Sequence, residues 1–139
     1  MKILVPVDGS ETSQKTIEAI IAQKERFPPK LSLLHVVDLR LAYRMIPEFQ
    51  LEMVRENARK AGLALLEKQS DLFRRAGFDV ELLLELGSPR EEIPRIANER
   101  GFQLLVIGRH ADTGEIRDVL FGSVANYVLH NVKCPVLLF

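Results

Sequence analysis

The stretch KILVPVDGSETS, residues 2–13, carries the local signals from which the fold is predicted. Its apolar run from Ile3 to Val7 is short and has almost no polar side chain, which is typical of a strand covered on both faces. Asp8 and Gly9 end the run, and Ser10 is a residue type favoured at the N-cap of a helix. The stretch therefore predicts a buried strand, a loop and the start of a helix.

The same unit recurs along the whole chain. Four helical segments separate five short apolar runs, which we predict to be strands at residues 3–7, 31–37, 80–86, 104–107 and 136–139. Strands that alternate with helices in this way indicate a parallel sheet with right-handed crossovers. We therefore expect one α/β domain over residues 1–139, a doubly wound five-stranded parallel sheet with helices on both faces.

The first two helical segments are identified by their apolar spacing. The first has Ile17, Ile20 and Ile21, and we expect it to end near Phe27-Pro28-Pro29 because proline cannot continue a helix. Gly77 is the expected C-terminal cap of the second segment. That second segment is long, and its apolar residues follow the three- and four-residue spacings of one buried face: Leu51, Val54, Ala58, Ala61, Leu65 and Leu72.

The third helix is predicted from the sequence GSPREE. Ser88 is the expected N-cap, Pro89 takes the first helical position, and Glu91 completes a capping box with Ser88. Pro94 lies one turn inside the same helix and is expected to bend it. The fourth helix is expected to begin near Gly122-Ser123.

Composition narrows the classes of function. The 139 residues include 19 Lys or Arg and 19 Asp or Glu, which argues against binding to nucleic acid or to an anionic membrane. The single Cys134 cannot form an internal disulfide, and the apolar runs are far shorter than the roughly 18 residues of a membrane span. We expect a soluble protein of the reducing cytoplasm.

Ligands of such sheets bind at the carboxyl ends of the strands, where the strand order changes direction. The loop after the first strand offers Asp8, whose carboxylate can either accept hydrogen bonds from a sugar or base, or cap its own loop. The stretch VIGRHADTGEIRDVLFGSVA, residues 106–125, has Gly108 at a strand end and Gly122-Ser123 at a helix start. These glycines fit either a phosphate site or a simple turn and N-cap.

Four blocks of the sequence together carry a resemblance. They are KILVPVDGS, LLHVVD, GSPREEI followed by LLVIGRH, and FGSVANYVLHNVKCPVLLF, and in this order and spacing the chain resembles the universal stress protein family. The resemblance implies strand order 3-2-1-4-5, a dimer, and a regulatory module that binds ATP, with or without Mg²⁺, in the stress response. One branch of that family binds ATP through a Gly-x2-Gly-x9-Gly-Ser/Thr motif.

The resemblance also implies the residues of the nucleotide site. Pro6, Val7 and Asp8 would meet the adenine and ribose, and Val36 would line the base pocket. The ribose and phosphates would be flanked by Ile107, Gly108 and His110 and held by Gly122, Ser123 and Val124. In this arrangement the segment 109–121 would order over the phosphates and present a surface to a regulatory protein.

Two departures from the family motif leave a second function open. Ala111 stands where the motif has its second glycine, and ten residues separate Ala111 from Gly122 where the motif has nine. Both changes could close the phosphate path, so the alternative is a nucleotide-independent dimeric interaction module that has lost the ATP site. A slow ATPase is the third possibility, with His110 or Asp112 as its only evident base.

Other functions of the same fold lack their residues. The chain has neither the acid cluster and lysine of a phosphoacceptor regulator nor a P-loop, and Gly9 alone is too few glycines for a dinucleotide site. Its three separated histidines do not form a zinc pattern. We interpret His35, on a buried strand, as a core histidine bonded to backbone, and Cys134 as a buried small residue.

The last predicted strand is the expected dimer contact. Residues 136–139, VLLF, have no charged side chain and no proline, so an edge in this position would be unguarded. Pairing of this edge with its symmetry mate would satisfy its backbone groups and cover its apolar side chains. We therefore expect a homodimer formed through the C-terminal strand.

Overall fold

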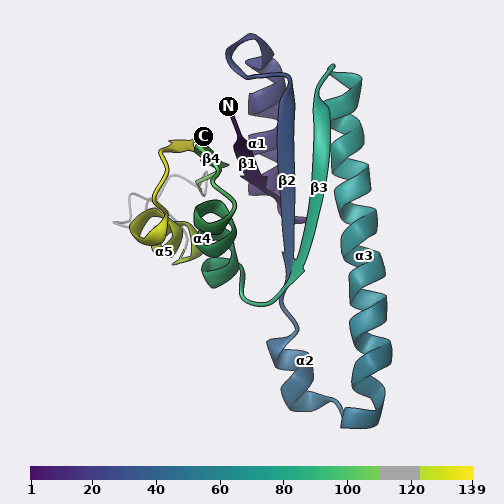
Figure 1. Cartoon of the computed structure of the whole chain (residues 1–139). Coiled ribbons are helices and arrows are strands. Elements are labelled where there is room, and N and C mark those ends of the chain that lie inside the picture. The colour runs from purple at the N-terminus through teal and green to yellow at the C-terminus, as the bar shows by residue number, and fades with distance from the viewer. Residues whose placement is uncertain (110–122) are drawn as a thin grey trace, which may run out of the picture.

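The computed structural model describes residues 1–109 and 123–139. Its centre is a five-stranded sheet in the order β3-β2-β1-β4-β5, and every neighbouring pair of strands is parallel (Figure 1). The predicted fold class is therefore confirmed, including the strand order. The strands are β1 (Ile3–Pro6), β2 (Lys30–Val37), β3 (Asp79–Leu86), β4 (Leu104–Ile107) and β5 (Val136–Leu138).

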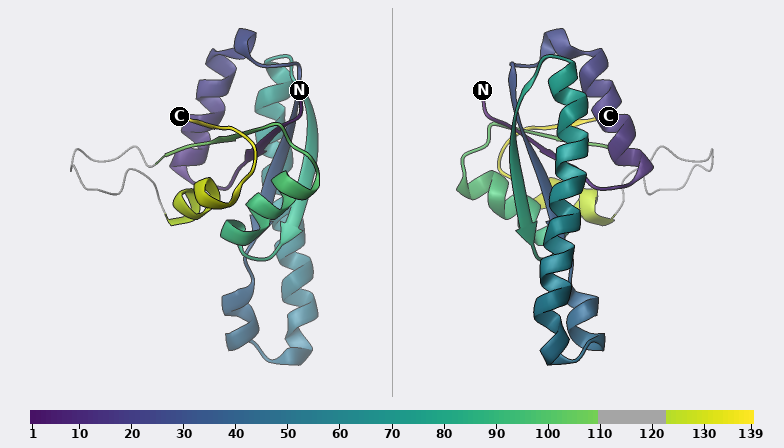
Figure 2. Two further views of the ribbon diagram at one scale, coloured as in Figure 1. Left: turned by 60° about the vertical axis from the view of Figure 1, so that its left-hand side comes forward. Right: turned by 90° about the vertical axis from the view of Figure 1, so that its right-hand side faces the viewer.

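Helices cover both faces of the sheet (Figure 2). One face is covered by α1 (Glu11–Ala22) and α3 (Glu48–Arg75), and the other by α4 (Pro89–Glu99) and α5 (Ser123–Asn131). A short helix, α2 (Arg40–Met45), lies between β2 and α3, and a 3-10 helix (Lys24–Arg26) follows α1. The chain thus forms the two layers of helices that a buried parallel sheet requires.

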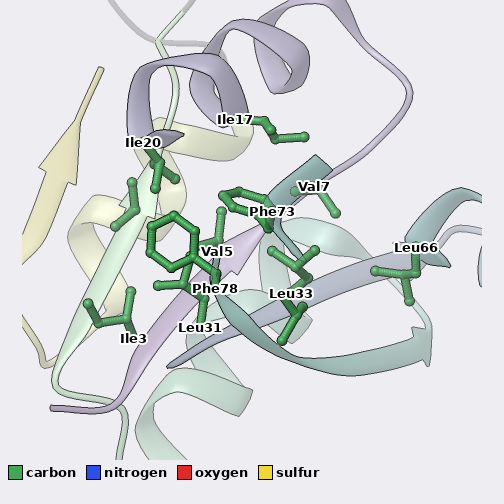
Figure 3. Packing of buried hydrophobic residues seen from close by; sticks show 12 residues of the cluster. Ile3, Val5, Val7, Ile17, Ile20, Leu31, Leu33, Leu66, Phe73 and Phe78 are labelled. Atoms are coloured by element: carbon green, nitrogen blue, oxygen red, sulfur yellow. The ribbon is translucent and has the colours of Figure 1, made fainter. Parts of the chain in front are cut away.

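Each face of the sheet has its own apolar core. On the α1 and α3 side, Ile17 and Phe73 are fully buried against the sheet, and Phe73 meets Phe78 edge to face with ring centroids 5.7 Å apart (Figure 3). On the other side, Ile96 of α4 and Val128 of α5 pack with Leu105. Successive residues of a strand point to opposite faces, which is why the apolar runs read as nearly continuous.

Gly62 lies where α3 packs closely on the sheet, and Gly77 lies just after the C-terminal end of that helix. At Gly62, an added Cβ atom would lie 2.9 Å from Cδ1 of Leu84, so a larger residue would require that side chain to shift. Gly77 has φ +99°, and the N–H groups of Gly77 and Phe78 donate to Arg74 and Phe73 in the pattern of a Schellman motif. The predicted C-terminal cap at Gly77 is confirmed.

Four local predictions were wrong. Helix α1 ends at Ala22, before Phe27, because the chain tightens there into the 3-10 helix. Ser88 is the N-cap residue of α4 and Pro89 its first residue, as expected, but the Ser88 side chain makes no capping bond. The N–H groups of Glu91 and Glu92 donate to the Ser88 carbonyl oxygen instead, so no capping box forms. The third error is α2, a helix of six residues that no apolar spacing indicated. The fourth is the buried face of α3, because none of the six predicted apolar residues is buried and Ala61 is exposed. The residues that are buried are Gly62, Leu66, Gln69, Ser70 and Phe73.

Helix α2 and the N-terminal half of α3, residues 40–60, extend beyond the end of the sheet (Figure 1). We call this segment the arm. The guanidinium of Arg55 on α3 donates to the Tyr43 hydroxyl of α2 and ties the two helices together. Four large apolar side chains of the arm are between 62% and 83% exposed: Leu41, Met45, Phe49 and Met53.

Candidate functional site

A cleft of about 290 Å³ opens at the carboxyl edge of the sheet. It lies where β1 and β4 diverge, the point at which the strand order reverses and where ligands of such sheets bind. Its lining comes from β1 and the loop after it, from α1, β2 and β4, and from the first turns of α4 and α5. The lining residues are Pro6, Val7, Asp8, Ser10, Thr12, Ser13, Thr16, Leu34, Val36, Pro89, Ile93, Ile107, Gly108, Val124, Ala125 and Val128.

One wall of the cleft is apolar. Val36 of β2 and Ile107 of β4 contribute to it, and Ile93 of α4 and Val128 of α5 face it from the helix layer. These side chains also belong to the core cluster on that face of the sheet, so their positions are fixed by packing. The wall is therefore a preformed surface for a flat apolar group.

Another part of the lining is polar and is organised around Asp8. The N–H of Ser10 donates to Asp8 Oδ1 (2.8 Å), and the N–H of Asp8 donates to the Ser13 hydroxyl (3.0 Å). The Ser10 hydroxyl in turn accepts from the N–H of Ser13 (3.1 Å), which confirms Ser10 as the N-cap of α1. Both readings of Asp8 are compatible with this loop, because its carboxylate caps the turn and also lines the cleft.

Side chains from behind the cleft hold the end of β1. His35 lies 2.9 Å through Nδ1 from the Val7 carbonyl oxygen, and since that oxygen can only accept, Nδ1 carries the proton. The prediction of a backbone-bonded core histidine is confirmed. Gln69 of α3 donates through Nε2 to the carbonyl oxygen of Asp8 (2.8 Å). Two successive carbonyl groups, those of Val7 and Asp8, are thus each bound by a side chain.

Gly108 is required by packing. A Cβ atom at this position would lie 2.2 Å from Thr16 Oγ1 and 2.9 Å from Thr12 Cγ2, both on α1. Its φ lies outside the left-handed region, so the expected tight turn is not the reason for the glycine. The absence of a side chain lets α1 lie against the end of β4 and keeps this side of the cleft narrow.

The structure brings together every predicted site residue whose side chain it describes. Pro6, Val7, Asp8, Val36, Ile107, Gly108 and Val124 all line the cleft. Ser123 is the first residue of α5, whereas His110, Ala111 and Gly122 lie outside the described residues, as does Asp112. That these residues contact a nucleotide stays a prediction.

Sequence reasoning missed part of the lining. Thr12 and Thr16 are one helical turn apart on α1 and so share a face, a spacing that could have indicated them. Pro89 and Ile93 show the same spacing on α4. Gln69 does not line the cleft and lies 61 residues from Asp8 in sequence, so no local pattern connects it with the site.

Asp38 and Cys134 are among the titratable groups outside the cleft that have shifted pKa values. The guanidinium of Arg40 hydrogen-bonds the carboxylate of Asp38, just after β2, and lowers the pKa of Asp38. Cys134 is half-buried, and this burial raises the pKa of its thiol, in keeping with a packing residue.

Among residues 1–109 and 123–139, no group of three or more His, Cys, Asp or Glu side chains could hold a metal ion. No helix in the described ranges is long and apolar enough to cross a membrane.

Comparison with known proteins agrees with the fold. Residues 1–139 match the model of the Universal stress protein family. Universal stress protein YxiE of Bacillus subtilis is 30% identical over 144 aligned positions, which cover 99% of this chain and 97% of YxiE. The solved structure of protein MJ0577 of Methanocaldococcus jannaschii matches with a TM-score of 0.76 at 29% identity, covering 99% of this chain and 94% of that one.

More distant relatives share the fold and were solved with nucleotides. A family protein of Arabidopsis thaliana with AMP bound matches with a TM-score of 0.71 at 20% identity, over all of this chain and 90% of that one. A universal stress protein in complex with cAMP matches with a TM-score of 0.65 at 23% identity, over all of this chain and 95% of that one. From the match over its full length and the identity to YxiE, the chain belongs to the universal stress protein family.

Proposed function

We propose that this protein is a cytoplasmic regulatory module of the stress response that binds an adenine nucleotide, ATP with or without Mg²⁺, in the cleft between β1 and β4. The observation that carries the proposal is a cleft that combines an apolar wall with the Asp8 network at the point where the strand order reverses. A purine base needs a flat apolar slot, and ribose hydroxyls need an acceptor such as a carboxylate. Asp8 and the wall containing Val36 supply both.

The phosphates would lie toward the start of α5. Val124, in the first turn of α5, lines the cleft, so the helix begins at its rim. Unpaired N–H groups at a helix N-terminus attract anions. The family resemblance implies Gly122 and Ser123 as the residues that would hold the phosphates there. Family members solved with AMP and cAMP support an adenine nucleotide as the class of ligand.

Thermal unfolding with added nucleotide tests this function. ATP with Mg²⁺, AMP and cAMP are each added to the purified protein at millimolar concentration, and at least one should raise the melting temperature. A ligand present at a hundredfold its Kd stabilises the native state by about 2.7 kcal/mol. If none of the three shifts the wild type, the nucleotide function is wrong.

A pair of tryptophan variants on α5 locates the binding. Val124 lines the cleft, whereas Asn126, two residues further on, is exposed and does not line it. Val124→Trp should fill the opening and abolish the nucleotide-induced shift, while Asn126→Trp should keep it. An equal shift in both variants would mean that the nucleotide binds elsewhere.

Any ATP hydrolysis should be slow. The described lining of the cleft contains one carboxylate, Asp8, and no lysine, so it offers few groups to orient an attacking water. Release of phosphate should stay far below the roughly 10 per second of typical enzymes. Turnover in that range would make the protein an enzyme.

A second candidate function, a dimeric interaction module, is favoured by the free edge of β5. This strand is last in the sheet, and Leu137 is 37% exposed there. The opposite edge strand, β3, has Glu81 and Glu85, whose charges guard it. We propose that β5 pairs with β5 of a second copy. Sedimentation should give about twice 15.8 kDa, with Leu137→Lys shifting the protein to monomer; a monomeric wild type at tens of micromolar would refute this.

A further inference from the structure

Gln69 is a buried polar side chain whose presence the packing of α3 does not explain. It is 5% exposed on the face of α3 that covers the sheet, one turn from Phe73. Its Nε2 donates to the Asp8 carbonyl oxygen, but its Oε1 is buried and has no hydrogen-bond partner among the described residues. An unpartnered buried acceptor destabilises the folded state, and an apolar side chain of the same size would avoid that loss.

The orientation of the Gln69 amide is fixed by its one partner. A carbonyl oxygen can only accept a hydrogen bond, so Nε2 must face Asp8 and Oε1 must face away from it. Flipping the amide would leave the donor unpartnered and place two oxygens against each other. The amide therefore keeps its hydrogen bond to Asp8, and Oε1 is left without a partner among the described residues.

This contact differs in origin from the others that hold Asp8. Its N–H and its carboxylate are bound by Ser13 and Ser10, which belong to the same loop and helix start and move with it. Among residues 1–109 and 123–139, only Gln69 binds Asp8 from another element, and it does so from the side of α3, outside the cleft. Because a trans peptide directs C=O and N–H oppositely, the N–H of Gly9 points away from α3.

Helix α3 packs closely on the sheet near Gln69. Gly62, two turns before Gln69, packs so closely on the sheet that an added Cβ atom would lie 3.3 Å from Cδ2 of His35. His35 binds the carbonyl oxygen of Val7, one residue before Asp8. The close approach at Gly62 thus fixes both the helix that carries Gln69 and the histidine beside it.

We propose that Gln69 is a positioning residue of the ligand cleft, which holds the Asp8–Gly9 peptide from behind so that the Asp8 carboxylate is preorganised for a ribose hydroxyl. It acts through Asp8 and does not itself touch the ligand. The proposal rests on the proposed nucleotide function for its consequence, but its structural part, the anchoring of the loop, holds in the free protein. Preorganisation of a loop strengthens binding because less ordering remains to be done.

Gln69→Met tests the proposal, because methionine keeps the length of the side chain and removes both the donor and the unpartnered oxygen. Gln69→Leu is the second variant should the first fold poorly. Ser70→Ala is the matched control: Ser70 is buried on the same helix, but its hydroxyl donates only to the carbonyl oxygen of Glu67 within α3. All are compared with wild type by melting temperature, amide hydrogen exchange and titration with ATP and Mg²⁺.

Gln69→Met should keep or slightly raise the melting temperature, yet speed amide exchange at Asp8 and Ser10, whose N–H groups donate to Ser13 and Asp8. Its affinity for ATP should fall by roughly fivefold to tenfold, the effect of one lost hydrogen bond. Ser70→Ala should leave loop exchange and ATP affinity unchanged. A residue with only a structural role would change ATP affinity merely in step with stability.

The two proposals can fail separately. Unchanged exchange at Asp8 and Ser10 in both Gln69 variants overturns the positioning role, whether or not the wild type binds ATP. Faster loop exchange together with unchanged ATP affinity overturns it as well, because the anchored loop would then not serve the ligand. If the wild type binds no nucleotide, the proposed function fails, and loop exchange alone decides whether Gln69 anchors Asp8.

Discussion

Phe73 and Phe49 lie on the same helix and have opposite surroundings. Phe73, near the C-terminal end of α3, is fully buried between the helix and the sheet, whereas Phe49, in the arm, is 83% exposed. The apolar spacing of α3 continues through both halves of the helix, but only the C-terminal half packs on the sheet. All the buried residues of α3 lie from Gly62 onward, whereas Leu51, Val54, Leu65 and Leu72 are only half-buried. The buried residues are Gly62, Leu66, Gln69, Ser70 and Phe73. A periodic apolar face thus predicts a helix without fixing how deeply each part of it is buried.

The largest effect should come from the buried half. Phe73→Ala is expected to lower the free energy of unfolding by about 3–5 kcal/mol, because it opens a cavity beside Phe78 in a closely packed core. Urea denaturation followed by circular dichroism measures this change. A loss below about 1 kcal/mol would show that the core on this face can collapse around the gap.

A smaller loss of stability is expected at Gly108, where α1 packs against the end of β4. Gly108→Ala places a methyl group against Thr16 and Thr12 of α1 and should lower the free energy of unfolding by about 1–3 kcal/mol. Gly9→Ala is the matched control, because nothing lies within 4 Å of its added Cβ atom and its φ is not left-handed. Equal stability of the two variants in urea would mean that α1 moves aside freely.

The ion pair at the base of the arm should add a still smaller, pH-dependent contribution. The hydrogen bonds from Arg40 lower the pKa of Asp38 from its usual 3.8, so the pair stabilises the fold above that pH and loses its effect as pH falls through and below it. Asp38→Asn should therefore be less stable than wild type around pH 6 and approach it in acid. Thermal melts across the acid range measure both. A difference that grows on acidification would contradict the assignment.

The smallest effect is expected at the tip of the arm. Phe49→Ala should change the free energy of unfolding by no more than about 0.5 kcal/mol, since little of the side chain is removed from water in the folded chain. The same urea experiment used for Phe73 provides the measurement. A loss comparable to that of Phe73→Ala would show that Phe49 is buried in solution, and the contrast between the two halves of α3 would disappear.

The sheet was predictable because its signals are local. Each strand is a short apolar run, and parallel strands bring their carboxyl ends to one edge, so Asp8 after β1 and Ile107 in β4 could be assigned to one site. Helix α2 could not be predicted, because six residues that expose Leu41 and Met45 have no buried face to reveal them. The strand order itself was inferred from family resemblance and not from the alternation of elements.

Contacts between segments that are distant in the sequence could not be predicted from it. Gln69 lies among charged residues on a long helix, where a polar side chain is ordinarily solvated, and only the packing of α3 brings it to Asp8. Gly108 suggested a turn because glycine at a strand end usually marks one, yet its neighbour Thr16 comes from a helix some ninety residues earlier. The capping box predicted at Ser88 failed for a similar reason. The Ser88 hydroxyl is buried and makes no hydrogen bond to the start of α4.

The position of β1 at the centre of the sheet has a consequence for folding during synthesis. Strands β1, β2 and β3 are neighbours and come from the first 86 residues, and the core beneath α1 and α3 takes only Val106 among its fully enclosed members from later in the chain. A nascent chain can therefore close that side first, as N-terminal segments generally do. The far side, including the wall built from Ile93, Ile107 and Val128, forms only after α5 has been synthesised as well. The proposed ligand cleft is therefore completed later than the core beneath α1 and α3.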